Sequence, residues 1–123
     1  MSARVIVCGS RGWRDRRAIS DRVAALALDP RIEFPPLLVH GRAPRGADRI
    51  VADLAARAGL PDEPHPADWE RHGKRAGFVR NEEMAALGAD LCIAFWDGTS
   101  RGTADMIARA EKHGIPVEIV RPS

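Results

Sequence analysis

The sequence predicts an α/β, three-layer domain with a mostly parallel five-stranded sheet and helices on both faces. Two observations carry this prediction. Short apolar segments rich in β-branched residues alternate along the chain with longer segments of helical periodicity. The connections are short, so each strand, helix and next strand should form a right-handed crossover within one sheet. With 123 residues and no linker, repeat or low-complexity segment, residues 1–123 are expected to form one domain.

The first half of the chain predicts three strands and two helices. Residues 4–8 are rich in β-branched side chains and are followed by a glycine, which is typical of a buried parallel strand. Residues 15–28 place apolar side chains at i, i+4 and i+7, so one stripe of a helix can face a sheet. Three prolines then interrupt the chain before a second strand at 37–40. Residues 46–58 form an apolar helical face that ends at a glycine, and the proline-rich residues 62–68 leave room for only a short third strand.

The second half predicts two helices and two strands. Residues 74–87 have helical spacing and end at a glycine, and the apolar run 90–95 reads as the fourth strand. Residues 102–113 form the last helix, which stops at a glycine with a proline just beyond it. Residues 115–120 close the sheet. From the fold class we expect the doubly wound strand order 3-2-1-4-5.

Composition and charge exclude several classes of protein. The 19 basic and 17 acidic residues leave a net charge of only +2, so a nucleic-acid partner is not expected although the pI is near 8.9. No apolar run approaches the roughly 20 residues that span a bilayer, so no membrane partner is expected. Cys8 and Cys92 lie inside apolar runs without CxxC spacing, which favours small buried side chains over a metal or redox role. We therefore expect a cytoplasmic protein without a metal.

Functional residues are expected where the strands end. In parallel sheets of this kind, ligands bind beyond the carboxyl ends of the strands, at the switch in strand order. The loops predicted at those ends hold much of the chain's Gly, Arg, Ser and Thr. The expected ligand-binding residues are Gly9, Ser10, Arg11, Trp13, His40, Gly41, Arg45, Gly46, Asp48, Asp68, Trp69, Arg80, Asn81, Trp96, Asp97, Gly98, Ser100, Gly102 and Thr103.

These loops have the chemistry of an anion site. Glycines let the backbone approach a ligand closely, and the helix that follows a loop offers unpaired N–H groups. The hydroxyls of Ser100 and Thr103 suit a phosphate, although plain N-capping of the last helix explains them as well. Arginines on the rim match phosphate and carboxylate oxygens, and the alternative is that they are solvated or paired with Asp48, Asp68 and Asp97.

Aromatic and titratable residues of the same loops leave alternatives open. Trp13, Trp69 and Trp96 could stack on a planar base, or they could plug the edges of a small sheet. The carboxylate of Asp48 could stabilise a helix start or lie beside a ribose hydroxyl. His40, at a strand end, is the histidine best suited to acid–base work.

Five ordered motifs resemble one known family. They are Gly-Ser-Arg-x-Trp at 9–13, His-Gly-x-Ala-x-Arg-Gly-Ala-Asp at 40–48, Pro-Ala-Asp-Trp at 66–69, Ala-Gly-x-x-Arg-Asn at 76–81 and Ala-Phe-Trp-Asp-Gly-x-Ser-x-Gly-Thr at 94–103. The second motif is one residue longer than usual before its Arg. Together they resemble the YspA-like (cpYpsA-related) branch of the SLOG superfamily. The glycine patterns match neither GxGxxG nor a P-loop, so no cofactor can be named from them.

The resemblance implies a Rossmann-like fold, a nucleotide-type ligand and frequent association with phage or mobile elements. Members are thought to sense or process nucleotide-derived ligands. The related LOG hydrolases carry Pro-Gly-Gly-x-Gly-Thr-x-x-Glu, whereas this chain has Thr99 and Ser100 at the double glycine and Met106 at the glutamate. If the chain is an enzyme, Asp68, Asp97 or His40 would have to supply the missing group.

Three functional hypotheses follow. The first is a sensor that binds a phosphorylated, nucleotide-derived small molecule at the strand ends. The second is a nucleotide-processing enzyme, either an N-glycosidase of the phosphoribohydrolase type or a phosphohydrolase. The third is a DNA-binding module, since the DNA-processing protein DprA belongs to the same superfamily. The superfamily also makes a homodimer an option, which the sequence does not fix.

Overall fold

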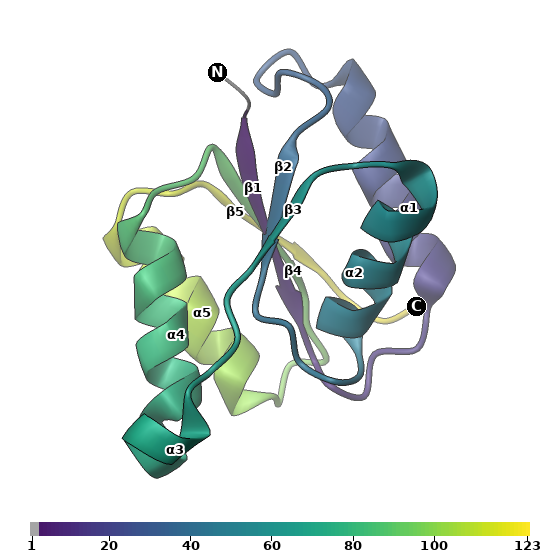
Figure 1. Ribbon diagram of the computed structural model, residues 1–123. Helices are drawn as coiled ribbons and strands as arrows, with labels where there is room; N and C mark the ends of the chain where they lie inside the picture. The colour runs from purple at the N-terminus through teal and green to yellow at the C-terminus, as the bar shows by residue number, and fades with distance from the viewer. Residues whose placement is uncertain (1–2) are drawn as a thin grey trace.

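Five parallel strands form the centre of the fold in the computed structural model, which describes residues 3–123 (Figure 1). Their order in the sheet is β3-β2-β1-β4-β5, as the sequence predicted, and every neighbouring pair is parallel. The strands are β1 (Arg4–Gly9), β2 (Leu37–His40), β3 (Asp62–Pro64), β4 (Leu91–Phe95) and β5 (Val117–Val120).

Helices cover both faces of this sheet, and the Rossmann-like, three-layer arrangement is confirmed. Figure 1 shows α1 and α2 on one side and α4 and α5 on the other. The helices are α1 (Arg16–Ala25), α2 (Ala47–Ala58), α3 (Trp69–His72), α4 (Ala76–Ala86) and α5 (Arg101–Lys112). Within the described residues, no helix is both long and apolar enough to cross a membrane.

Alternation along β1 divides the core into two layers. Val5 and Val7 point into the layer under α1 and α2, while Ile6 and Cys8 point into the layer under α4 and α5. Successive side chains of a strand lie on opposite faces, so a strand buried on both faces must be apolar throughout. Cys92 lies in the second layer with Cys8, and both are buried with free thiols, as expected for small core side chains.

The predicted elements differ from the observed ones mainly at two places, before α4 and after α1. The helix expected over residues 74–87 is preceded by the short helix α3, and a 3-10 turn at Gly73–Arg75 leads from α3 into α4. Asp68 begins α3, because its carboxylate accepts a hydrogen bond from the Arg71 N–H at 3.1 Å. The first helix is also shorter than predicted, since residues Leu26–Leu28 form a 3-10 turn. These turns tighten the chain where helical periodicity alone predicts continuation.

The loops after β1 and β2 are packed directly against each other at the carboxyl edge of the sheet. The Ala47 N–H donates to the Ser10 carbonyl oxygen at 3.2 Å, which joins the start of α2 to the loop after β1. Gly46 lies between them with φ of +77°, and a Cβ there would come within 2.4 Å of the Ser10 oxygen. Only glycine allows this approach. The two loops therefore form one rigid edge.

Candidate functional site

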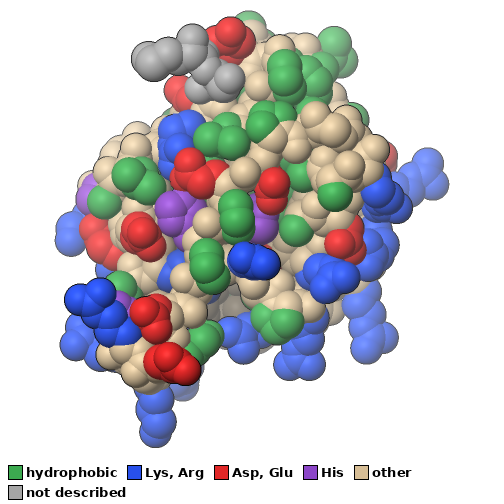
Figure 2. Space-filling model, viewed as in Figure 1, with side chains coloured by type: hydrophobic (Ala, Val, Ile, Leu, Met, Phe, Trp, Pro, Cys, Tyr) green, Lys and Arg blue, Asp and Glu red, His purple; other side chains and the backbone are tan. Residues whose placement is uncertain are grey.

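A cavity of about 290 Å³ opens at the carboxyl edge of the sheet, and we call it the rim cavity. Its walls come from the loops after β1 and β2, from the start of α2, from α3 and α4, and from the start of α5. The lining residues are Arg11, Ala43, Asp48, Trp69, Lys74, Gly77, Phe78, Arg80, Asn81, Ser100 and Gly102. Figure 2 shows Lys and Arg side chains gathered along the lower edge of the view, where the strands of Figure 1 end.

Three cations line the rim cavity, and two of them have no protein partner. Within residues 3–123, the side chains of Arg11 and Lys74 make no hydrogen bond and no ion pair, and both are exposed. Arg80 is half-buried, and its Nη1 donates to the Gly41 carbonyl oxygen at 2.5 Å. Its Nε donates to Asn81 Oδ1 at 2.9 Å. Burial lowers the pKa of the Arg80 guanidinium, and the nearby carboxylate of Asp48 opposes that effect.

Gly41 makes room for this arginine. A Cβ at position 41 would come within 2.2 Å of Arg80 Nη1 and 2.9 Å of Asp48 Oδ2. Arg80 and Asp48 therefore approach the same point on the backbone, and any side chain at position 41 would displace them. The glycine of the His-Gly motif thus holds a half-buried cation beside a buried carboxylate.

Asp48 is the carboxylate of the rim cavity. It lies in the first turn of α2, where a negative charge is favourable, and its Oδ2 accepts the Ala43 N–H at 3.1 Å. Burial raises the pKa of Asp48, while the Ala43 hydrogen bond and the charge of Arg80 oppose the rise. The residue is only 7% exposed.

The start of α5 supplies backbone donors to the same cavity. Ser100 caps the helix, with its Oγ 3.4 Å from the Thr103 N–H, and the N–H groups of Thr99 and Ser100 both donate to Asp97 Oδ1 at 2.8 Å. Within residues 3–123, the N–H groups of Arg101 and Gly102 have no protein acceptor. Helix starts with free N–H groups bind anions well.

Asn81 fixes α5 to the rest of the cavity wall. Its Nδ2 donates to the Gly102 carbonyl oxygen at 3.2 Å and to Asp105 Oδ2 at 3.0 Å. Its Oδ1 accepts from Arg80, so one buried side chain joins the cation on α4 to the first turn of α5. The Arg-Asn pair of the sequence motif therefore works as a unit.

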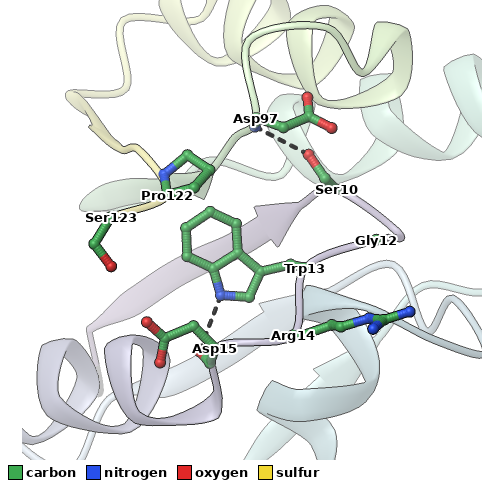
Figure 3. Close-up of a pocket in the computed structure, with 8 residues that line it drawn as sticks. All are labelled: Ser10, Gly12, Trp13, Arg14, Asp15, Asp97, Pro122 and Ser123. Atoms are coloured by element: carbon green, nitrogen blue, oxygen red, sulfur yellow. Dashed lines mark hydrogen bonds between the residues drawn. The ribbon is translucent and has the colours of Figure 1, made fainter.

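A second cavity, of about 260 Å³, lies beside Trp13, and we call it the Trp13 cavity. Figure 3 shows the Trp13 ring between Pro122 and Asp15, with the Asp97 carboxylate pointing away from the ring. The indole Nε1 donates to the Asp15 carbonyl oxygen at 3.0 Å. The ring packs edge to face on Phe95, with centroids 5.4 Å apart. Trp13 therefore belongs largely to the core, being only 7% exposed.

The candidate site residues of the sequence fall into separate groups. Arg11, Asp48, Trp69, Arg80, Asn81, Ser100 and Gly102 meet at the rim cavity. Gly41 joins Arg11, Trp69 and Arg80 in a small adjoining cavity. Ser10, Trp13 and Asp97 line the Trp13 cavity, and Arg45 and Gly46 line a shallow cavity on the other side of Trp13. The residues that line none of these cavities are Gly9, His40, Asp68, Trp96, Gly98 and Thr103.

His40 is held by its neighbours in a way that does not suit acid–base work. Its Nδ1 accepts the Arg42 N–H at 3.1 Å, so the proton of the neutral ring is on Nε2, which donates to Asp62 Oδ2 at 2.8 Å. The ring is buried. Both nitrogens are therefore hydrogen-bonded within the fold, and His40 is not among the residues that line the rim cavity.

Trp69 and Trp96 also differ in their surroundings. Trp69 is 52% exposed on the wall of the rim cavity. Trp96 instead donates from its Nε1 to the Ser100 carbonyl oxygen at 3.0 Å, and Arg121 lies over its ring at 5.0 Å from the centroid. Of the three tryptophans, Trp69 is the one available to a ligand in the rim cavity.

Besides Ala43 of the loop after β2, three lining residues escaped the sequence analysis, namely Lys74, Gly77 and Phe78. They belong to the turn before α4 and to its first residues. For Gly77 and Phe78 the signal that could have found them is their helical spacing from Arg80 and Asn81, since residues three and four apart share a helix face, whereas Lys74 precedes that helix.

Comparison with known proteins supports the resemblance noted in the sequence. The chain is 45% identical over 120 residues to the Gene 61 protein of Mycobacterium phage D29, and the match covers 93% of each chain. The name of that phage protein indicates no activity. Residues 3–72 match the family model described as YspA, cpYpsA-related SLOG family. That segment holds the loop after β1 and the start of α2, from which Arg11 and Asp48 respectively reach the rim cavity. On both grounds, the chain belongs to the YspA, cpYpsA-related SLOG family.

Proposed function

We propose that the protein binds a phosphorylated, nucleotide-derived small molecule in the rim cavity and acts as a ligand sensor. One observation carries the proposal. The free side chains of Arg11 and Lys74 line the same cavity as the start of α5, where the N–H groups of Arg101 and Gly102 lack a protein acceptor within residues 3–123. Donors and cations without a protein partner on one wall are what an anionic ligand requires.

The charge balance favours a phosphate monoester. Arg11, Lys74 and Arg80 face a single carboxylate, that of Asp48, among the lining residues, all of which lie within residues 3–123. A phosphate monoester carries about −1.5 to −2 charges at pH 7, which this excess of positive charge can neutralise. An arginine fork and a helix start both suit its terminal oxygens.

The size and the aromatic wall favour a mononucleotide. A volume of about 290 Å³ is at the lower end of the range for small-molecule sites, roughly 300–1,000 Å³. Trp69 and Phe78 are 52% and 40% exposed on the wall. Exposed rings of this kind can stack on any nucleobase, because every base has an aromatic face.

A nucleotide hydrolase is the second candidate, because Asp48 is a carboxylate on the cavity wall. The position that carries the glutamate in the LOG signature holds Met106, which packs in the core and is 1% exposed. Asp97 lines the Trp13 cavity, and Asp68 caps α3. We therefore expect binding without turnover. The ligand found by binding is the substrate to assay for product formation over a blank.

Thermal shift measurements with a nucleotide panel test the proposal. Ligand at about 100 times its dissociation constant adds roughly 2.7 kcal/mol, which raises the unfolding midpoint by several degrees. The panel contains nucleoside mono-, di- and triphosphates, NAD, ADP-ribose and cyclic dinucleotides. We expect one class to raise the midpoint of the wild type.

Two charge-matched variants locate the binding. Arg11 and Arg14 are neighbouring exposed arginines without a partner in the described residues, and they line the rim cavity and the Trp13 cavity respectively. We expect Arg11→Ala to lose the shift and Arg14→Ala to keep it. A panel without any shift, or an equal loss in both variants, would contradict the proposal.

A further inference from the structure

Asp48 supplies the only carboxylate among the residues that line the rim cavity, all of which lie within residues 3–123. We infer that Asp48 makes the site selective for ligands that carry a hydroxyl donor near their phosphate, of the kind that a ribose supplies and a 2-deoxyribose lacks. The inference rests on the proposed function, since it concerns a ligand bound in the same cavity. It adds a specificity-determining residue and narrows the ligand class.

One oxygen of Asp48 is free and faces the cavity. Oδ2 accepts the Ala43 N–H, whereas Oδ1 has no hydrogen-bond partner within residues 3–123. No buried side-chain nitrogen or oxygen of the described residues lacks a partner, so Oδ1 must be accessible to solvent. Asp48 is 93% covered by protein, and the opening that reaches it is the rim cavity. A nearly buried carboxylate therefore presents one unused acceptor to a ligand.

This acceptor lies at the opposite end of a short series of contacts from the proposed phosphate donors. Asp48 and Arg80 both approach Gly41, Arg80 bonds to Asn81, and Asn81 bonds to the first turn of α5 at Gly102. A ligand with its phosphate at the start of α5 would pass Arg80 before it reached Asp48. The group next to the phosphate is then the one that meets the carboxylate.

The charge of Asp48 disfavours a second anion at that position. A carboxylate accepts hydrogen bonds from hydroxyl groups, and such charge-assisted bonds are about twice as strong as neutral ones. The same carboxylate repels phosphate or carboxyl groups at close range. The ligand that fits both ends of the cavity carries one phosphate and, beside it, a hydroxyl donor. A ribonucleotide has this layout.

Paired ribo- and deoxyribonucleotides test the inference. The probes are the four common ribonucleoside 5′-monophosphates and their 2′-deoxy counterparts, titrated calorimetrically into the full chain. A hydrogen bond to a charged group contributes about 1.5–3 kcal/mol, so we expect the wild type to bind the ribo form at least about tenfold more tightly. Asp48→Ala should bind both forms of a pair within about threefold, and Asp48→Asn should lie between, because its amide oxygen is a neutral acceptor.

Asp21→Asn is the matched control, because Asp21 is a 73% exposed carboxylate on α1, paired with Arg17, and neither residue lines any of the cavities described above. It should keep the ribose preference. Equal affinity of the wild type for the two forms of each pair would overturn the inference while leaving the proposed function intact. Preference unchanged in Asp48→Ala would also overturn it and would assign Asp48 a purely structural role. If no monophosphate binds at all, the inference fails, whereas the proposed function fails only if the whole nucleotide panel gives no thermal shift.

Discussion

The two cavities at the carboxyl edge of the sheet are similar in size and differ in the state of their polar groups. In the Trp13 cavity the indole N–H is bonded to the Asp15 carbonyl oxygen, and Asp97 Oδ1 accepts two backbone N–H groups. In the rim cavity, within the described residues, Arg11, Lys74 and one oxygen of Asp48 have no protein partner. Among the same residues the Trp13 cavity also has an unpartnered cation, Arg14, so the rim cavity is distinguished by having its unpartnered cations beside the free N–H groups at the start of α5.

The difference shows why residue type alone identifies a site poorly. Both cavities contain arginine, aspartate, serine and tryptophan. A polar group that is already satisfied within the fold gains little from a ligand, since binding only exchanges one partner for another. A group held on a rigid wall without a partner gains the full interaction. Matched substitutions, one in each cavity, therefore distinguish residues that serve the fold from residues that are available to a ligand.

The largest expected effect is the difference in stability between the Trp13→Ala and Trp69→Ala variants. Trp13→Ala removes a ring that is 7% exposed and packs edge to face on Phe95, so we expect a loss of about 3–5 kcal/mol in the free energy of unfolding. Trp69→Ala removes a 52% exposed ring and should cost less than about 1 kcal/mol. Denaturant unfolding measures both. If Trp69→Ala proved the more destabilising, the assignment of Trp13 to the core would be wrong.

Gly41 and Gly12 form a second pair, which tests whether a side chain added to the backbone of each cavity changes ligand affinity. A Cβ at position 41 collides with Arg80 Nη1, whereas a Cβ at position 12, in the Trp13 cavity, meets nothing within 4 Å. Displacing a charged donor should weaken binding of the nucleotide found by the thermal panel roughly 10- to 100-fold in Gly41→Ala. Gly12→Ala should bind as the wild type does. Calorimetry with both variants decides, and normal affinity in Gly41→Ala would mean that Arg80 takes no part.

The layer order and the edge of the sheet that holds the cavities could be predicted from sequence. Periodicity separates strands from helices, and right-handed parallel crossovers then bring the loops after β1, β2 and β4 to one edge. The order β3-β2-β1-β4-β5 confirms that reasoning. Arg11, Asp48 and Arg80, expected at this edge, do line one cavity there.

The orientation of individual side chains could not be predicted. Trp13, Trp69 and Trp96 all follow strand ends in polar loops, yet one lies in the core, one on the cavity wall and one against Arg121. Which one is free depends on the helix that follows each loop, and periodicity does not determine that. His40 is a similar case, since its role was decided by the Asp62 carboxylate on the neighbouring strand. Tertiary contacts of this kind are absent from local sequence.

Glu63 provides a fully partnered carboxylate to compare with Asp48. Its oxygens accept from Arg4 Nη1 and Nη2 at 2.9 Å and contact His65 Nε2 at 2.6 Å. The Arg4 hydrogen bonds, followed by that of His65, lower the pKa of Glu63 from 4.5 to about 2. Because the pKa is lowered on folding, the stabilisation is complete above pH 4.5 and is lost as the pH falls toward 2.

Glu63→Gln should therefore flatten the dependence of stability on pH over that window. Because Glu63 is partly solvated, we expect a loss on the order of 1–2 kcal/mol at pH 7. The exposed Glu70→Gln on α3 is the control and should follow the wild type. Asp48 should behave oppositely, since burial raises its pKa. Urea unfolding between pH 2 and pH 7 measures these curves, and identical curves for wild type and Glu63→Gln would contradict the assignment.

Ser100 should give the smallest effect, and it separates capping from ligand contact within the rim cavity itself. Its Oγ caps α5 through the Thr103 N–H and lies 3.1 Å from Thr103 Oγ1, so the hydroxyl is already partnered. Removing such a cap costs about 1 kcal/mol of stability, whereas the free N–H groups of Arg101 and Gly102 remain in place for a phosphate. Ser100→Ala should thus lower the unfolding midpoint by a few degrees and change ligand affinity less than about threefold. Ser20→Ala, on the exposed face of α1, is the control for the loss of a hydroxyl from a helix. A tenfold loss of affinity without loss of stability would show that a partnered group can serve the ligand too, and the distinction between the two cavities would then have to be drawn on shape and charge alone.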